Sequence, residues 1–461
     1  MTFGSNSAAR RDIDSLLHPY TNLARHQETG PLIIERGKGI HVWDDQGRDY
    51  IEGMAGLWSV SLGFGEEELI EAATEQMRKL AFSQLFTHRS TAPAIALAEK
   101  LKELAPVPMS KAFFAGSGSE ANDAVIKMVW YYNNALGRPQ KKKFISRHKA
   151  YHGVSVASTS LTGLPACHRD FDQPLAGFLH TRCPHYYREG QNGESEADFS
   201  DRLVDELKAL IAAEGADTIA AFIAEPVMGA GGVIMPPTGY FEKIGSLLRD
   251  NDILLIADEV ICGFARTGNM WGCQTVNMQP DIMTMAKALS SSYLPISAVL
   301  IPEFMHGAMI DESRKIGTFG HGNTYSGHPV CAAVALKTIE IMEKRDILGH
   351  VRRVAPLFNR RFRALADHPL VGEVRSIGLI GGIELVADKA TRRPFEASPT
   401  VAPTVVNMAR DHGLIARAIG DTVALCPPLI IKEDEIGDMF DRLERALDDA
   451  EGWVGREGLR G

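Results

Sequence analysis

The chain has 461 residues, of which 45% are hydrophobic and 23% charged. These values are ordinary for a globular protein and allow one large domain and a smaller one. A formal charge of −9 argues against a nucleic-acid-binding face, and no apolar run reaches the length of a membrane span. The six cysteines include no CxxC pair, so we expect reduced thiols in a cytoplasmic protein.

The first 65 residues contain short β-like runs punctuated by glycine, and we expect this segment to join a small domain. Between residues 66 and 330, helical and strand-like patterns alternate, which predicts a large α/β domain with a mostly parallel sheet flanked by helices. The helical patterns lie at 67–80, 92–104 and 239–251, and the apolar strands at 111–115, 142–147, 218–227 and 252–260. Residues 331–461 predict a smaller α+β domain.

Residues that could bind a ligand or take part in catalysis follow these apolar strands. They are the Gly-Ser-Gly-Ser turn at 116–119, then Glu225, Asp258 and Lys287. Because ligands collect at the carboxyl ends of parallel strands, we expect these residues to converge at one edge of the sheet.

The turn at 116–119 lies directly between a strand and a helix. Backbone N–H groups and the helix dipole favour an anion there, and the serine hydroxyls add donors. A simple helix cap, with Glu120 as an acid in the first turn, is the alternative interpretation.

Asp258 and Lys287 complete the pattern. An acid at a strand end can simply cap it, but its charge can also keep a pyridine nitrogen protonated. Glu259 is the competing acid, and alternation along the strand turns it to the other side. A lone lysine is usually a surface residue, whereas an apolar setting lowers its pKa and makes it a nucleophile and base. With the phosphate-sized turn, the pair predicts a pyridoxal 5'-phosphate (PLP) enzyme.

Several segments resemble the class III aminotransferases, which are fold-type I PLP enzymes, and the similarity covers nearly the whole chain. It is carried by GSGSEAN, AYHGVS, AEPVMGAGG, ADEV followed by GFARTG, and the lysine of AKALSS. Further segments resemble the bacterial amine:pyruvate (omega) transaminases: GMAGLWSV, KMVWYYNNALGRP, HGNTYSGHP and ARAIGDTVALCPPL. The resemblance implies a seven-stranded sheet in a PLP-binding domain at 66–330, and a small domain formed by 1–65 and 331–461.

The resemblance also implies roles for individual residues. Catalysis falls to Lys287 as the Schiff-base residue, to Asp258 at the ring nitrogen and to Tyr151 on the ring face. The implied cofactor contacts are Ser117, Gly118, Ser119, Tyr151, His152, Glu225, Asp258, Val260, Lys287 and Thr324. Thr324 is implied to reach the phosphate from a neighbouring subunit, which makes a homodimer, possibly a dimer of dimers, part of the site.

Arg417 is the implied clamp for the carboxylate of a 2-oxo acid, since a guanidinium can hold a carboxylate with two parallel bonds. A surface salt bridge is the alternative. An aromatic-walled substrate pocket is implied for Tyr20, Leu57, Trp58, Phe86, Ala230 and Ile261. Ordinary core packing stays open for Leu57 and Ile261. Asn323 replaces the aromatic residue that many relatives have before the threonine.

The predicted activity is a PLP-dependent transamination from a primary amine or ω-amino acid to pyruvate, in ping-pong half-reactions that give alanine. Taurine, β-alanine or a polyamine as donor stays open, as does an aminomutase or a decarboxylase of the same fold. A catalytically silent PLP-binding regulator is the alternative from another class. No metal is expected in the site, and neither nucleic acid nor membrane is expected as a partner.

Overall fold

The computed structural model describes residues 7–396 and 401–460. Its largest element is a seven-stranded sheet, confirming the predicted α/β architecture. In spatial order the strands are β4 (Lys111–Ala115), β10 (Ser297–Ile301), β9 (Ile282–Met285), β8 (Leu254–Asp258), β7 (Ile219–Ala224), β5 (Lys143–Arg147) and β6 (Phe178–Thr181). β10 is antiparallel to both of its neighbours and the other four pairs are parallel, so the sheet is mostly parallel.

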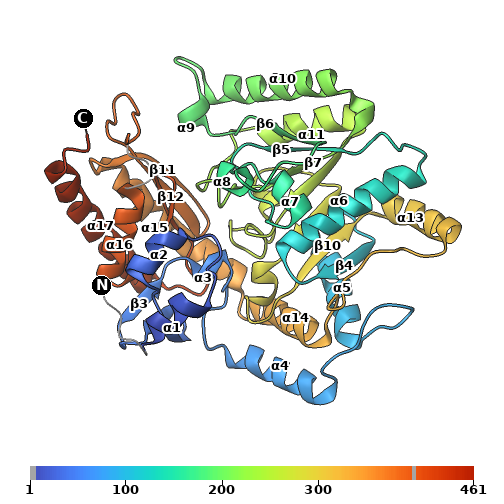
Figure 1. Ribbon diagram of the computed structural model, residues 1–461, viewed down its shortest axis with the longest axis horizontal. Coiled ribbons are helices and arrows are strands. Elements are labelled where there is room, and N and C mark those ends of the chain that lie inside the picture. Colours follow the sequence, from blue (N-terminus) through green and yellow to red (C-terminus); the bar gives the residue numbers. More distant parts are fainter. Residues whose placement is uncertain (1–6, 397–400, 461) are drawn as a thin grey trace.

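Both faces of this sheet are covered by helices (Figure 1). Alternation along the strands directs Ile223 and Ile256 into one apolar cluster and Phe222 and Leu255 into another. The first cluster is completed by α6 (Gly118–Ala135), α7 (Val156–Leu161) and α13 (Glu303–Ile316). The second is completed by α4 (Glu67–Lys79), α5 (Ala92–Leu104), α10 (Glu196–Glu214), α11 (Tyr240–Asp250) and α14 (Pro329–Lys344). Strands buried on both faces explain the continuous apolar runs in the sequence.

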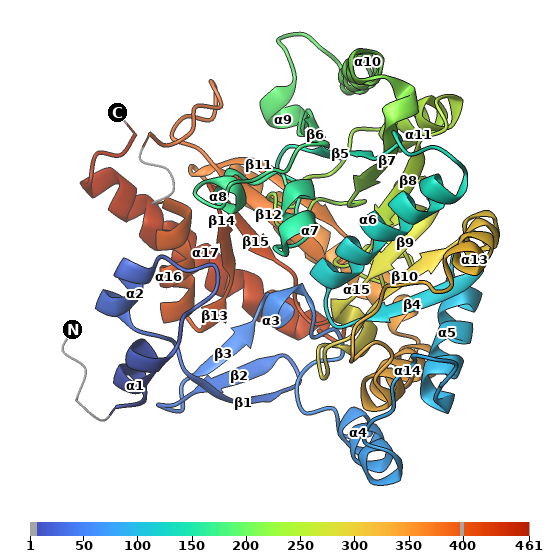
Figure 2. The same ribbon diagram turned by 45° about the vertical axis from the view of Figure 1, so that its right-hand side comes forward.

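Two smaller sheets lie beside the large one. The first has the order β1 (Ile34–Lys38), β2 (His41–Asp44), β3 (Asp49–Glu52) and β13 (Leu414–Ile415). The second has the order β11 (Val371–Ile377), β12 (Ile380–Leu385), β15 (Thr422–Leu425) and β14 (Arg417–Ile419). β13 pairs in parallel with β3, so the two ends of the chain share one sheet. Both views place the blue and red ends of the chain together (Figures 1 and 2). The predicted domain boundaries at 65/66 and 330/331 stay a prediction.

Further helices complete the structure. The helices packed around the small sheets are α15 (Ile347–Ala364), α16 (Val401–Asp411) and α17 (Glu433–Arg456). The short helices are α1 (Ala8–Ser15), α2 (Leu23–Thr29), α3 (Ala55–Trp58), α8 (Pro165–His168), α9 (Tyr186–Glu189) and α12 (Gly272–Thr275). Single 3₁₀ turns are η1 (Ala216–Thr218), η2 (Lys287–Ser290) and η3 (Leu365–Asp367). Within the described ranges, no helix has both the length and the apolar character needed to cross a bilayer.

Candidate active site at the carboxyl edge of the large sheet

The Gly-Ser-Gly-Ser turn forms the start of α6. Ser117 is the N-cap, and its Oγ accepts a hydrogen bond from the Glu120 N–H at 3.2 Å. A Cβ at Gly118 would lie only 3.2 Å from the Val260 side chain, so a larger residue would crowd this turn. The Ser119 Oγ accepts from the Val154 N–H at 3.2 Å. The turn therefore presents the N-terminus of an 18-residue helix beside two serines, a setting that favours an anion.

Asp258, at the last position of β8, is held by two buried partners. Its Oδ2 lies 2.8 Å from the His152 Nδ1 and accepts a hydrogen bond from the Asn122 Nδ2 at 2.9 Å. The Asn122 Nδ2 also donates to the backbone oxygen of His152 at 2.7 Å. Burial alone would raise the pKa of the Asp258 carboxyl, but the hydrogen bonds from His152 and Asn122 outweigh it and lower that pKa. This buried group therefore carries a negative charge at neutral pH.

Glu259 contacts a different part of the chain, as strand alternation predicts. Its carboxylate accepts from the Gly272 N–H at 2.9 Å and the Cys273 N–H at 2.7 Å. Burial raises its pKa to about 7 despite these donors. Glu259 thus anchors the start of α12, and Asp258 alone of the two lies beside His152.

Lys287 begins the 3₁₀ turn that follows β9 and has a left-handed φ of 49°. Its amine has no hydrogen-bond partner among the residues that the structure describes. Burial lowers the pKa of the amine, and the negative charges of Asp258 and Glu225 oppose this shift only in part. The result is a desolvated amine near two carboxylates, which suits a nucleophile and proton carrier.

Glu225 follows β7 and organises the loops around the site. Its Oε1 accepts from the Tyr151 N–H and its Oε2 from the Gly229 N–H, both at 3.0 Å. Burial raises the pKa of this carboxyl. Glu225 therefore fixes the segment of Tyr151 and the turn that leads to Ala230.

These residues fit the phosphate, ring and aldehyde of PLP. The helix start at Ser117–Ser119 suits the phosphate, and the buried negative charge of Asp258 calls for a cation such as a protonated ring nitrogen. The Lys287 amine is available for the aldehyde. Two buried polar atoms, the Asn122 Oδ1 and the His152 Nε2, lack hydrogen-bond partners in the described part of the chain. Buried polar atoms normally have partners, so these two are free to contact a bound group.

Arg417 begins β14 and lies near Lys287, Tyr20 and Tyr151, whose charges influence one another. The guanidinium is half-buried and, within residues 7–396 and 401–460, forms no ion pair or hydrogen bond. Burial lowers its pKa, although the group stays charged. The Tyr20 hydroxyl lies 3.6 Å from the Cys167 Sγ. Partial desolvation of this hydroxyl raises the pKa of Tyr20, although the residue as a whole is 64% exposed. The structure thus brings an unpaired cation to the sheet edge.

The other predicted pocket residues divide into two groups. Trp58 and Ile261 are buried in one apolar cluster with Cys426, and Ala230 is half-buried in the turn near Ile261. Leu57 is 55% exposed on the distorted helix α3.

Phe86 and Thr324 line a cavity of about 290 Å³. The cavity is lined by Phe82, Ser83, Gln84, Phe86, Arg89 and Thr324. In the described ranges no hydrogen bond or apolar-cluster contact joins Phe86 or Thr324 to Asp258 or Lys287. Asn323, next to Thr324, donates from its Nδ2 to the Glu120 Oε2 at 3.4 Å.

Two functional residues were missed by the sequence reasoning. Asn122 was part of a quoted motif, but its link to Asp258 was not foreseen; it lies four residues after Gly118, on the same face of α6. Glu52 accepts from the Met54 N–H at 3.1 Å and the Gly56 N–H at 2.9 Å, and so supports the loop of Leu57. No spacing signal identified Glu52.

The family model of the class-III aminotransferases matches residues 23–447. The chain belongs to this family, and it is a PLP-dependent aminotransferase of fold type I.

Known relatives agree on the class, and their names include gamma aminobutyrate transaminases and omega transaminases. Gamma aminobutyrate transaminase 3, chloroplastic, from Solanum lycopersicum is 48% identical over 440 residues, covering 95% of this chain and 85% of that protein. The omega transaminase from Pseudomonas jessenii, solved in complex with PMP, is 57% identical with a TM-score of 0.97, covering 98% of this chain and 99% of that one.

A third relative is a W58M/F86L/R417L variant of the thermostable omega transaminase PjTA-R6, engineered for asymmetric synthesis of enantiopure bulky amines. It is 56% identical with a TM-score of 0.96, covering 97% of this chain and 100% of that one.

Proposed function

We propose that this transaminase moves an amino group from a primary amine or ω-amino acid to pyruvate, producing alanine. The observation that carries this proposal is the unpaired, half-buried guanidinium of Arg417, whose charge acts on Lys287. A guanidinium without an acidic partner can bind the carboxylate of a 2-oxo acid in two parallel bonds. Because it has no ion pair to break, it can also move aside for an uncharged substituent.

The relatives support a donor of this class. A donor such as gamma-aminobutyrate carries a carboxylate, and Arg417 could bind that carboxylate as it would bind the carboxylate of pyruvate. An apolar amine has no carboxylate and would contact only the apolar walls of the pocket. The residue types and numbers substituted in the variant made for bulky amines coincide with Trp58, Phe86 and Arg417 of this chain. This supports the assignment of these three residues to the substrate pocket.

The residues of the chain divide the chemical work. PLP, when bound, supplies an electron sink for the carbon that bears the amine. The negative charge of Asp258, held by His152 and Asn122, maintains the proton on the ring nitrogen. The pKa of the Lys287 amine is lowered, so its Nζ can take a proton from the amine-bearing carbon in one half-reaction. In the other half-reaction it delivers a proton to that carbon. Tyr151 and Val260 lie near this edge of the sheet and are assigned to the two faces of the ring.

The proposal is tested by replacing Arg417 with leucine and measuring each half-reaction separately. Activity with pyruvate and with gamma-aminobutyrate should fall by about 10- to 100-fold, because a charge-assisted hydrogen bond contributes about 1.5–3 kcal/mol. Single-turnover ketone formation from an apolar aromatic amine should change by no more than about twofold, since that substrate has no carboxylate.

Arg361→Leu is the matched control. Arg361 is also half-buried, but its guanidinium is paired with Asp441 and Glu444 at the surface of α17, so substrate preference should not change. Wild-type activity should be higher with pyruvate than with 2-oxoglutarate. A strong preference for 2-oxoglutarate, or no transfer of labelled amine nitrogen to alanine, would contradict the proposal; CO₂ release or amine migration would instead indicate a decarboxylase or an aminomutase.

We also propose a homodimer in which Phe86 and Thr324 act in the site of the other subunit. Support comes from the exposed apolar side chains around the 290 Å³ cavity, since large exposed apolar patches mark interaction sites. Phe82 and Tyr325 are 43% and 69% exposed. Their rings pack edge to face, with the ring centroids 6.1 Å apart. A second copy would cover these rings by a symmetric contact.

A further inference from the structure

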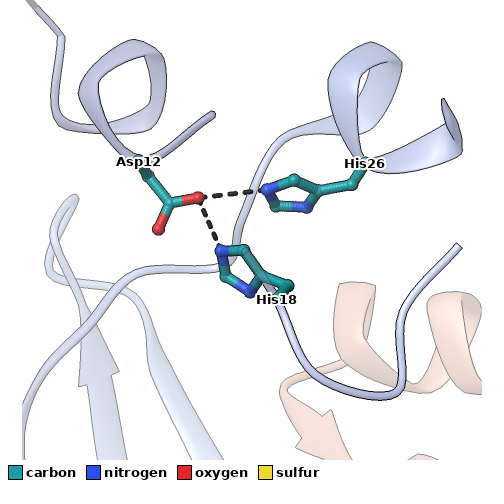
Figure 3. Close-up of side chains that lie close together, drawn as sticks. All are labelled: Asp12, His18 and His26. Carbon is teal, nitrogen blue, oxygen red and sulfur yellow. Dashed lines mark hydrogen bonds and ion pairs between the residues drawn. The ribbon is translucent and has the colours of Figure 1, made fainter. Parts of the chain in front are cut away.

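Asp12, His18 and His26 form a cluster outside the active site, in the N-terminal segment (Figure 3). Asp12 lies in α1, His18 in the loop after it and His26 in α2. The Nε2 atoms of His18 and His26 lie 2.8 Å and 3.1 Å from the same Asp12 Oδ2. The two rings are 4.1 Å apart at their centroids. Three separate pieces of chain therefore direct potential ligand atoms to one point.

The chemistry of this cluster matches a metal site. Imidazole and carboxylate are the ligand types that zinc and other first-row divalent ions prefer, and three protein ligands leave positions for water. The ligand atoms all lie within 4.8 Å of one another. In the described part of the chain, no lysine or arginine pairs with Asp12, so its charge is not neutralised by another cation. With neutral imidazoles the cluster carries one net negative charge.

A second cluster shows what a site already filled by a cation looks like. His185, Glu373 and Glu384 also converge, but the Arg375 guanidinium lies among them. Its Nη1 donates to the Glu384 Oε2 at 2.8 Å and lies 2.9 Å from the His185 Nε2. Arg188 pairs with the same Glu384 at 2.6 Å. Guanidinium groups thus supply the positive charge in that cluster, whereas none of the described residues places a guanidinium at Asp12.

We propose that Asp12, His18 and His26 bind a divalent first-row transition-metal ion, with zinc as the representative ion. The three residues lie in the N-terminal segment, away from Lys287 and Asp258, where the sequence predicts no metal. Bound metal would join α1 to α2 and fix the intervening loop, which carries Tyr20. Because the Tyr20 hydroxyl contacts Cys167 and lies near Arg417, the metal would stabilise one wall of the substrate pocket from outside it.

The test uses the tag-free holoenzyme, stripped with a chelator and titrated with zinc against a chromophoric competitor. We expect one site per chain, and at least about tenfold weaker binding in each of Asp12→Asn, His18→Gln and His26→Gln. His41→Gln is the matched control, because His41 lies 3.1 Å from the Asp49 carboxylate without a third ligand. It should bind zinc as the wild type does.

A second measurement reports on the segment without substrate or turnover. Arg25 is exposed at the start of α2, and zinc should slow tryptic cleavage there in the wild type and in His41→Gln but not in the three ligand variants. The zinc-free variants should still unfold cooperatively, which shows that they fold. Zinc binding that survives the loss of any one of the three ligands, or a wild type that binds no zinc, would overturn the proposal. Neither result depends on the proposed amine or pyruvate specificity.

Discussion

Two regions differ in how many of their contacts one chain supplies. They are the carboxyl edge of the large sheet and the surface around the 290 Å³ cavity, which we call the rim (Phe82, Phe86, Thr324 and Tyr325). At the edge, Asp258 is buried and connected to His152 and Asn122, and burial lowers the pKa of Lys287. At the rim, aromatic rings are exposed, and no described contact links them to Asp258 or Lys287.

The two regions obey different physical constraints. The carboxylates at the edge are buried, so each needs hydrogen-bond donors in place when the chain folds. Apolar rings at the rim can stay exposed until another surface covers them. The edge therefore carries the shared chemistry of the class, and the rim is where a second subunit would add to it.

Among the substitutions considered, Lys287→Ala should cause the greatest loss of activity. Removal of the amine that moves the proton should lower turnover by at least about 10⁴-fold, the upper range for general acid–base catalysis. Circular dichroism and the melting temperature should stay close to those of the wild type. Lys127→Ala is the control, since Lys127 is exposed on α6 and its Nζ lies 3.0 Å from the His321 Nδ1. An alanine variant with full activity would remove Lys287 from the mechanism.

A subunit-mixing experiment tests whether the rim belongs to the neighbouring copy. Thr324→Ala should lower activity at limiting PLP by about tenfold. This is the effect on cofactor affinity expected when one hydrogen bond to a charged phosphate is lost. Mixed dimers of Lys287→Ala and Thr324→Ala chains would contain one intact site only if Thr324 acts across the interface. Random reassociation should then restore about a quarter of the wild-type sites.

The control for this experiment pairs Lys287→Ala with Asp258→Asn, both at the edge of the same chain. Mixed dimers of these two variants contain no intact site, so mixing should restore nothing. If the Thr324 mixture also stays inactive while dimers form, Thr324 acts within its own chain. Sedimentation would report a monomer if the dimer itself is wrong.

The sequence predicted the positions of Glu225, Asp258 and Lys287 because each lies at or just after the end of an apolar strand. It did not reveal the link from Asn122 to Asp258. The strand positions of Glu225 and Asp258, and the opposite orientation of Glu259, followed from period-two alternation. The antiparallel strand β10 was not predicted, because an apolar run does not show its direction. Thr324 and Phe86 came from the family resemblance alone, since composition and spacing carry no information about a surface formed by two chains.

The smallest expected effect concerns Glu52, which connects the buried core to the exposed Leu57. Burial raises the pKa of Glu52 to about 7, although the Met54 and Gly56 N–H groups favour its charged form. The folded state therefore holds this proton more tightly than the unfolded chain, whose carboxyl has the ordinary value of 4.5. The resulting stability is fully present below about pH 4.5 and is lost as the pH rises through about 7, by up to about 3 kcal/mol.

Glu52→Gln removes this titration, because an amide stays neutral and can accept only through one oxygen. The variant should be less stable than the wild type by about 1 kcal/mol near pH 5, for the lost hydrogen bond. This deficit should shrink or reverse by about pH 8, where the wild type carries a buried charge. Urea unfolding at several pH values measures the difference, and Glu35→Gln, on the exposed part of β1, is the control. A difference that stays constant across this range would mean that Glu52 does not titrate there.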